Sequence, residues 1–359
     1  MKPRSPSSPL SLRLFCLVAA WWIGCLLLRA APPSPPKSKP DAIIYEGSYP
    51  GWPWVIRTRD GLLLCVFREG TEHDYSSSGQ ALLCRSDDQG RTWSKPSVVV
   101  DAPAVDDRNV AITELPNRDL LVVYNTYTAA RESLAMHLRS TDGGRSWSQP
   151  APIGERNTRT RAAAVVLTNG TLLLPYYVAP GNGALAARSS DNGRSWTTVP
   201  VPDAPDFVGD EWDLLEAAPD RLVGILRNNA PKSDGFFWQT ESRDGGRHWS
   251  IPRKTNVQSR RATAPAQIAW HNRTPILLYP DRRMVSVSAV KTTDPDFTRW
   301  EVDQPLVCYV YNPDESPLQD ASYPVSVQLD SRRRLIVDYE IRPASRRIAA
   351  YCVEFPAGW

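Results

Sequence analysis

Short apolar runs that follow polar turn residues recur along the chain. Two of them, at residues 62–67 and 172–174, come shortly after an Asp-Gly or Asn-Gly pair. Runs of the same character occupy residues 120–124, 222–226, 276–279 and 335–337. Short apolar runs bounded by such turns predict buried β-strands joined as hairpins. The pattern therefore indicates an all-β protein and argues against a helical bundle.

A polar octapeptide that ends in tryptophan recurs four times, at residues 86–93, 140–147, 189–196 and 242–249. Its central aspartates, Asp88, Asp142, Asp191 and Asp244, are 54, 49 and 53 residues apart. This spacing is typical of the blades of a β-propeller. A degenerate fifth copy fits residues 294–300, and the mean spacing fits residues 42–359 about six times.

The repeats predict a six-bladed β-propeller of four-stranded antiparallel blades, with the octapeptides as turns. The sixth blade has no octapeptide. Its three C-terminal strands, near Val325, Ile336 and Ala349, would be completed by an N-terminal strand around Ile43 and Ile44. That pairing would close the ring.

The octapeptide, Ser-x-Asp-x-Gly-x-Thr/Ser-Trp with His248 in one copy, is the Asp-box. With six repeats, the chain resembles the sialidase (neuraminidase) superfamily of Asp-box, or BNR-repeat, propellers, and in particular bacterial exo-alpha-sialidases. We interpret the boxes themselves as structural, because their polar side chains close a hairpin turn and their tryptophan packs between strands.

Strand parity predicts which face of the propeller carries a site. The Asp-boxes join the third and fourth strands of a blade, and the Asp-Gly turns join the first and second. Because antiparallel strands alternate in direction, both kinds of turn share one face. The residues before the first strand and after the second lie on the opposite face, near the central axis.

Arginine occurs among these axial residues in every blade. The six arginines are Arg68, Arg108, Arg161, Arg227, Arg282 and Arg342. Acids and aromatic residues stand between them, and Trp52 and Trp212 offer flat faces to a sugar ring. Guanidinium groups in this number favour a site for an anionic ligand.

The resemblance implies a mechanism and roles for particular residues. Tyr323 opens the last blade and would be the nucleophile, with Glu211 as its base. Arg227 and Arg282 would belong to the arginine clamp on the substrate carboxylate, and Glu340 would orient an arginine near Arg342. The acid/base would be Asp74, in the loop of residues 69–78, with Glu72 and His73 as alternatives.

One signature of the family is missing. Its Arg-Ile-Pro motif aligns with Gly51, Trp52 and Pro53, so the first clamp arginine is absent unless Arg68 or Arg108 replaces it. The substrate would then be sialic acid or another anionic sugar. Two alternatives stay open: a carbohydrate-binding propeller without catalysis, and a scaffold for protein partners.

The N-terminus predicts export. Three basic residues precede an apolar run from Leu14 to Leu28, followed by Arg29 and a proline-rich stretch. We interpret residues 1–31 as a signal peptide or N-terminal signal anchor, residues 32–41 as a Pro-rich linker and residues 42–359 as the propeller. The protein would be periplasmic or extracellular, with a membrane anchor as the alternative.

Charge and cysteine usage narrow the function further. Four of the 42 basic residues lie in the first 30, which hold no acid, and the other 38 nearly match the 39 acids. This balance argues against a nucleic-acid-binding protein. Cys65, Cys84, Cys308 and Cys352 are compatible with disulfides or with buried thiols. No residue spacing predicts a metal or cofactor site.

Overall fold

The computed structural model describes residues 35–179, 181, 183–259 and 264–359. The predicted signal segment, residues 1–31, lies outside this part of the chain. The described residues form six antiparallel β-sheets and no helix, and hence no helix long and apolar enough to cross a membrane. Each sheet is one blade, and the all-β, six-bladed propeller predicted from the repeats is confirmed.

The first three blades follow one another along the chain. Blade 1 comprises β2 (Gly51–Arg57), β3 (Leu63–Glu69), β4 (Gln80–Ser86) and β5 (Ser97–Val100). Blade 2 comprises β6 (Asp106–Glu114), β7 (Leu120–Tyr127), β8 (Ser133–Ser140) and β9 (Ala151–Arg156). Blade 3 comprises β10 (Thr158–Thr160), β11 (Val165–Val166), β12 (Leu172–Val178), β13 (Ala184–Ser189) and β14 (Thr197–Pro200), with β10 and β11 sharing the inner position.

The last three blades complete the circle. Blade 4 comprises β15 (Gly209–Ala218), β16 (Arg221–Asn228), β17 (Phe236–Ser242) and β18 (Arg253–Gln258). Blade 5 comprises β19 (Gln267–His271), β20 (Thr274–Asp281), β21 (Ser286–Lys291) and β22 (Leu306–Val310). Blade 6 comprises β23 (Asp320–Ala321), β24 (Val325–Gln328), β25 (Arg333–Ile341), β26 (Arg346–Glu354) and the N-terminal β1 (Ala42–Glu46).

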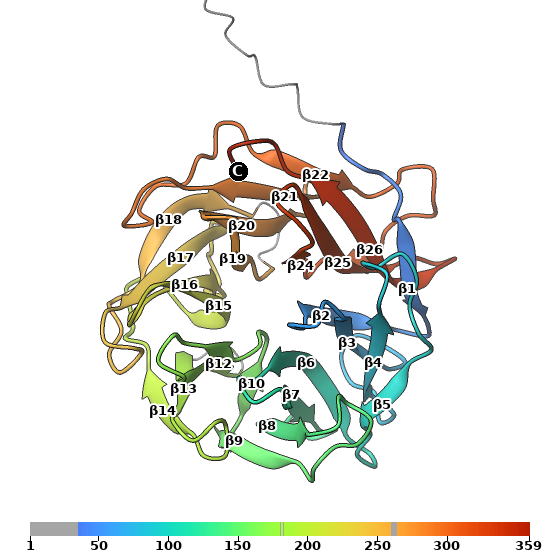
Figure 1. Cartoon of the computed structure of the whole chain (residues 1–359), viewed down its shortest axis with the longest axis horizontal. Helices are drawn as coiled ribbons and strands as arrows, with labels where there is room; N and C mark the ends of the chain where they lie inside the picture. Colours follow the sequence, from blue (N-terminus) through green and yellow to red (C-terminus); the bar gives the residue numbers. More distant parts are fainter. Residues whose placement is uncertain (1–34, 180, 182, 260–263) are drawn as a thin grey trace, which may run out of the picture. The chain divides into compact units, whose positions relative to one another are not determined.

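The ring closes where β1 pairs with β26, as the sequence predicted (Figure 1). The inner strands lie around the axis, and β5, β9, β14 and β18 lie at the rim (Figure 1). A blade packs against a neighbour on each face, so its second strand is apolar on both sides. In β3, every residue is buried. This two-sided burial explains why the second strands read as uninterrupted apolar runs.

The Asp-box turns are held together by hydrogen bonds. In the first box, Asp88 accepts bonds from the backbone N–H groups of Arg91 and Thr92 and from the hydroxyls of Thr92 and Ser86. These bonds, that from the Thr92 hydroxyl first, hold the pKa of Asp88 well below its usual range. In the fourth box, His248 takes the place of the hydroxyl and contacts Asp244 through Nδ1 at 2.6 Å.

The four cysteines beyond the signal segment are free thiols in this structure. Cys65 and Cys84 lie directly opposite each other in β3 and β4, and both are buried. Burial raises the pKa of Cys84 to about 11, so it is a protonated, apolar core side chain.

Candidate functional site

Irregular pairing at the start of three inner strands aims side chains at the axis. The pairing register shifts between Gly51 and Trp54 in β2, between Arg108 and Ala111 in β6, and between Gly209 and Trp212 in β15. Trp52 and Asn109 there have φ angles of 52° and 51°, which non-glycine residues rarely adopt. Such bulges commonly re-aim a side chain beside an active site.

Tyr323, Glu211 and Arg227 meet at the axis. The Tyr323 hydroxyl donates a hydrogen bond to Glu211 Oε2 at 2.9 Å, and Arg227 Nη1 donates to the same oxygen at 2.6 Å. Arg227 Nη1 also lies 3.4 Å from the Tyr323 oxygen. The structure thus brings together three residues that lie in blades 4 and 6.

Tyr323 is 9% exposed, and its ring lies on a buried cation. The Arg161 guanidinium sits between the Tyr323 ring at 5.0 Å and the Trp54 ring at 5.3 Å. Burial first, and the Glu211 carboxylate next, raise the pKa of Tyr323, while Arg227 and Arg282 act in the opposite sense. The phenol is therefore neutral at physiological pH and has a hydrogen-bonded base.

Asp338, in β25, fixes the backbone that carries Tyr323. Its carboxylate accepts bonds from the Tyr323 N–H at 2.8 Å and from the Ser322, Tyr309 and Tyr311 hydroxyls at 3.0, 2.6 and 2.8 Å. Asp338 is fully buried, and this burial raises its pKa. A buried carboxylate with this many donors makes the position of Tyr323 rigid.

A cavity of about 230 Å³ opens above the Tyr323 hydroxyl. Its walls come from blades 1, 2, 3, 4 and 6: Trp52, His73, Arg108, Asn109, Asn125, Arg159, Tyr177, Gly181, Asp210, Glu211, Arg227, Asn229 and Tyr323. All lie on the face opposite the Asp-boxes, as strand parity predicted. Three arginines from three successive blades share this one small volume.

The two carboxylates of the cavity, Asp210 and Glu211, lie side by side in β15. Burial and the neighbouring Glu211 raise the pKa of Asp210 to about 6, although Arg227 opposes the shift. The Arg227 guanidinium is 3.9 Å from Asp210 and 2.6 Å from Glu211. The cavity therefore holds a carboxyl group of raised pKa beside an ion pair, the combination that proton-transfer sites use.

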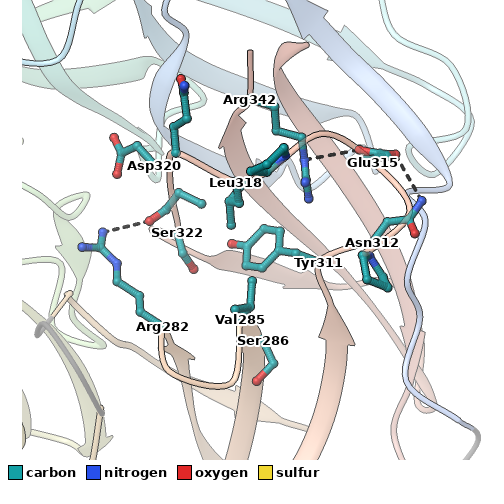
Figure 2. Close-up of a pocket in the computed structure, with 14 residues that line it drawn as sticks. Arg282, Val285, Ser286, Tyr311, Asn312, Glu315, Leu318, Asp320, Ser322 and Arg342 are labelled. Carbon is teal, nitrogen blue, oxygen red and sulfur yellow. Dashed lines mark hydrogen bonds and ion pairs between the residues drawn. The ribbon is translucent and has the colours of Figure 1, made fainter. Parts of the chain in front are cut away.

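A second cavity, of about 420 Å³, lies on the blade 5 and blade 6 side (Figure 2). Arg282 and Arg342 reach it from different sides, with Tyr311 and Leu318 between them (Figure 2). Arg282 Nη2 donates to the Ala321 carbonyl at 2.8 Å. Arg282 therefore lines this cavity and not the smaller one, although its charge acts on Tyr323.

Three of the predicted site residues are buried away from both cavities. Arg68 is 0% exposed and pairs with Asp106 at 2.6 Å, so it is not a substitute clamp arginine. Trp212 is 1% exposed and donates to the Tyr176 carbonyl, because the β15 bulge turns it into the core. Glu340 is 1% exposed, pairs with Arg347 and Arg342, and accepts a hydrogen bond from the Tyr351 hydroxyl, so it orients these neighbours.

The predicted acid, Asp74, does not line the cavity. It is 61% exposed and pairs with Arg131 at 2.9 Å. Its neighbour His73 lines the cavity instead. Arg161 is 3% exposed and lies beneath Tyr323, whereas Arg159, two residues earlier, reaches the cavity wall. Arg342 is 2% exposed, and its guanidinium is held by Glu315, Glu340 and Ser316.

Sequence reasoning missed Arg159 and Asp320. Arg159 lies in β10 and Arg161 follows directly after its end, so their two-residue spacing suggests that both approach the axis, but not which one reaches the cavity. Asp320 lies in β23, two residues before the positive-φ residue Ser322. No sequence pattern singles out that position. Among the described residues, no group of His, Cys, Asp and Glu could hold a metal ion.

The chain is similar to known families and structures in this fold. A family model described as a BNR repeat-like domain matches residues 52–149 and 130–331. A protein of unknown function from Dyadobacter fermentans is 21% identical, with a TM-score of 0.75 over 89% of this chain and 99% of its own. No curated protein sequence matches.

Two sialidase structures share the same architecture. The NanB sialidase from Streptococcus pneumoniae is 13% identical, with a TM-score of 0.71 over 89% of this chain and 71% of its own. The intramolecular trans-sialidase from Ruminococcus gnavus is 10% identical, with a TM-score of 0.68 over 89% of this chain and 97% of its own. At these identities, the likeness concerns the fold.

Proposed function

This chain belongs to the BNR repeat-like domain family of the sialidase-like superfamily, and we propose that it is a glycoside hydrolase that removes a terminal acidic sugar from a glycan. One observation carries the proposal. The buried Tyr323 hydroxyl donates to Glu211 at 2.9 Å, and Arg227 binds the same carboxylate oxygen. A phenol that faces a cavity and touches a base is equipped for nucleophilic attack.

Tyr323 Oη would attack the anomeric carbon while its proton moves to Glu211. A carboxylate nucleophile would repel an anionic group beside the anomeric carbon, whereas a neutral phenol would not. Arg227, which contacts both oxygens, would stabilise the charge that develops on the phenol. Arg161 beneath the ring would favour the same negative charge.

Recognition of an acidic sugar would fall to the arginines that line the cavity. Among the described residues, the hydrogen bonding of Arg159 involves only Nε, at 3.3 Å from the Ser133 hydroxyl. Its two terminal nitrogens could bind a carboxylate or sulfate bidentately. Trp52 would offer an apolar wall. The predicted signal segment supports an exported, periplasmic or extracellular, site of action, with a membrane anchor as the alternative.

A second candidate function is glycan binding without turnover. It is favoured by the absence of the first clamp arginine, at Gly51, and by the pairing of Arg227 with Glu211. Such a protein would bind an acidic sugar in the same cavity and release no product.

Hydrolysis of a fluorogenic N-acetylneuraminic acid glycoside, and of a uronic acid and a sulfated-sugar counterpart, tests the proposal. We expect turnover of at least one, and a loss of kcat/KM of about a thousandfold or more in Tyr323→Phe. Tyr176→Phe removes another buried phenol hydroxyl, bonded to Thr198 in blade 3, and should retain activity. Saturable binding of the same sugars with no product would favour the second candidate.

A further inference from the structure

His73 is held in place beside the cavity by a carboxylate that the family resemblance does not assign. Its Nδ1 lies 2.9 Å from Asp320 Oδ2. The Tyr49 hydroxyl donates to the same oxygen at 2.6 Å, and the Tyr339 hydroxyl lies within 3.3 Å of both Asp320 oxygens. Burial raises the pKa of Asp320, but the bonds from His73 and Tyr49 outweigh it and hold that pKa below its usual value.

An ionised Asp320 fixes the chemistry of the imidazole. A carboxylate beside Nδ1 requires a proton on that nitrogen, so Nε2 is the ring nitrogen that exchanges protons. Among the described residues, Nε2 has no hydrogen-bond partner. The His73 ring also packs edge-on against Trp52, with 5.4 Å between the ring centres. His73 and Tyr323 line the same cavity.

The loop that carries His73 is tied down at three successive carbonyl groups. Arg68 Nη1 donates to the Glu72 carbonyl at 2.7 Å, and Arg108 Nη2 donates to the His73 carbonyl at 2.9 Å. Arg108 Nη1 bonds the Asp74 carbonyl. Arg68 is itself anchored by the buried Asp106. The position of His73 therefore depends on buried ion pairs and not on closure of a free loop.

We propose that His73, positioned by Asp320, is the acid/base of the hydrolysis, and that Asp74 is not. This inference rests on the proposed function. Three features separate the two neighbours: His73 lines the cavity, its Nδ1 is oriented by Asp320, and the Asp74 carboxylate is paired with Arg131. A histidine oriented by a carboxylate is a common device for proton transfer.

The hydrolysis would proceed in two steps. In the first, His73 Nε2–H gives its proton to the glycosidic oxygen as the C–O bond breaks, and Tyr323 Oη bonds the anomeric carbon and gives its proton to Glu211. In the second, His73 Nε2 takes a proton from water, which attacks the anomeric carbon. The C–O bond to Tyr323 then breaks, and Tyr323 recovers its proton from Glu211.

The test compares two substrates that differ only in how much the leaving group needs a proton. One is an aryl glycoside with a nitrophenol leaving group, and the other is a lactoside of the same acidic sugar. In the full chain, we expect His73→Asn to lower kcat/KM on the lactoside at least about a hundredfold, and on the nitrophenyl glycoside less than about tenfold. Asp320→Asn should show the same ordering more weakly, and Asp74→Asn should lower neither.

Control measurements distinguish a failure of the role of His73 from a failure of the proposed hydrolase activity. His73 is 57% exposed, so His73→Asn should keep the melting temperature of the wild type. Equal losses on both substrates, no loss in His73→Asn, or the leaving-group pattern in Asp74→Asn would each overturn the role of His73, while Tyr323→Phe stays inactive. If instead the wild type and Tyr323→Phe are equally inactive on every substrate, the proposed function fails, and the role of His73 fails with it.

Discussion

At the scale of single residues, the propeller tolerates buried carboxylates that are not fully paired. Asp107 is 0% exposed; its Oδ2 accepts a bond from the Ala102 N–H at 2.8 Å, and its Oδ1 has no partner among the described residues. Burial, with smaller contributions from Asp101 and Asp106, raises the pKa of Asp107 to about 7. Asp107 does not line either cavity described above, so it can be changed without altering the site.

Asp107→Asn should therefore stabilise the protein above neutral pH. With a folded-state pKa above the unfolded value, native Asp107 binds a proton that the unfolded chain releases, so its contribution to stability falls as the pH rises from about 4 to about 7. The amide removes this penalty and keeps an oxygen for the Ala102 N–H. We expect a gain of about 2 kcal/mol at pH 8 and almost none at pH 4, measured by urea unfolding.

The matched control is Asp101→Asn, which removes an exposed carboxylate from the loop just before β6. It should change stability at pH 8 by no more than about 0.5 kcal/mol. A destabilised Asp107→Asn at pH 8 would mean that the ionised carboxylate is the form that the fold requires.

At the scale of elements, the Asp-box is a turn that stabilises its own hairpin. Asp191 accepts hydrogen bonds from the Arg194 and Ser195 N–H groups and from the hydroxyls of Ser195 and Ser189. The bonds from Ser195 come first among the causes that hold its pKa below the usual range. All four bonds lie within one turn, so their loss should affect one blade and leave the site on the opposite face intact.

Asp191→Ala should lower the free energy of unfolding by about 1 to 2 kcal/mol, because it leaves turn donors without their acceptor. Thermal and urea unfolding measure this loss. Asp203→Ala, at an exposed aspartate in the segment after β14, is the control and should leave stability unchanged. Hydrolysis should persist in both variants; a loss of activity in Asp191→Ala at unchanged stability would contradict a purely structural box.

The elements were predictable from sequence because turn chemistry is local. The four octapeptides and the apolar second strands were enough to predict six blades and the closing strand β1. They also predicted which face of the propeller carries the site. The side chains were less predictable. A bulge adds one residue to a strand and sends each later side chain to the other face, as at Trp212. The choice between Asp74 and His73 depended on Asp320, which is 247 residues from His73 in sequence.

At the scale of the whole molecule, one strand closes the ring. β1 is the outer strand of blade 6, although the rest of that blade is C-terminal. Ile44 is 6% exposed in the core, whereas its neighbour Ile43 is 38% exposed. The pairing register shifts between Ile43 and Tyr45, so Ile44 sits at a bulge that turns it into the core. Ile43 and Ile44 therefore offer a matched pair for testing what closure contributes to stability.

Ile44→Asp should lower stability by about 3 kcal/mol or more, because it places a charge in the core between β1 and its blade. Ile43→Asp carries the same charge on the solvent side and should cost less than about 1 kcal/mol. Urea unfolding of the two variants beside the wild type measures the difference. A loss in Ile44→Asp as small as that in Ile43→Asp would show that the core contact of β1 contributes little to the closed ring.

The contact between His73 and Asp320 also joins the first blade to the last, since His73 belongs to blade 1 and Asp320 to blade 6. Tyr49, which precedes β2, reaches across to the same carboxylate. During synthesis, Tyr49 and His73 leave the ribosome early, whereas Asp320 leaves it near the end of the chain. Asp320 thus arrives only after five blades have been made, and His73 gains its carboxylate partner only once the two ends of the chain have met.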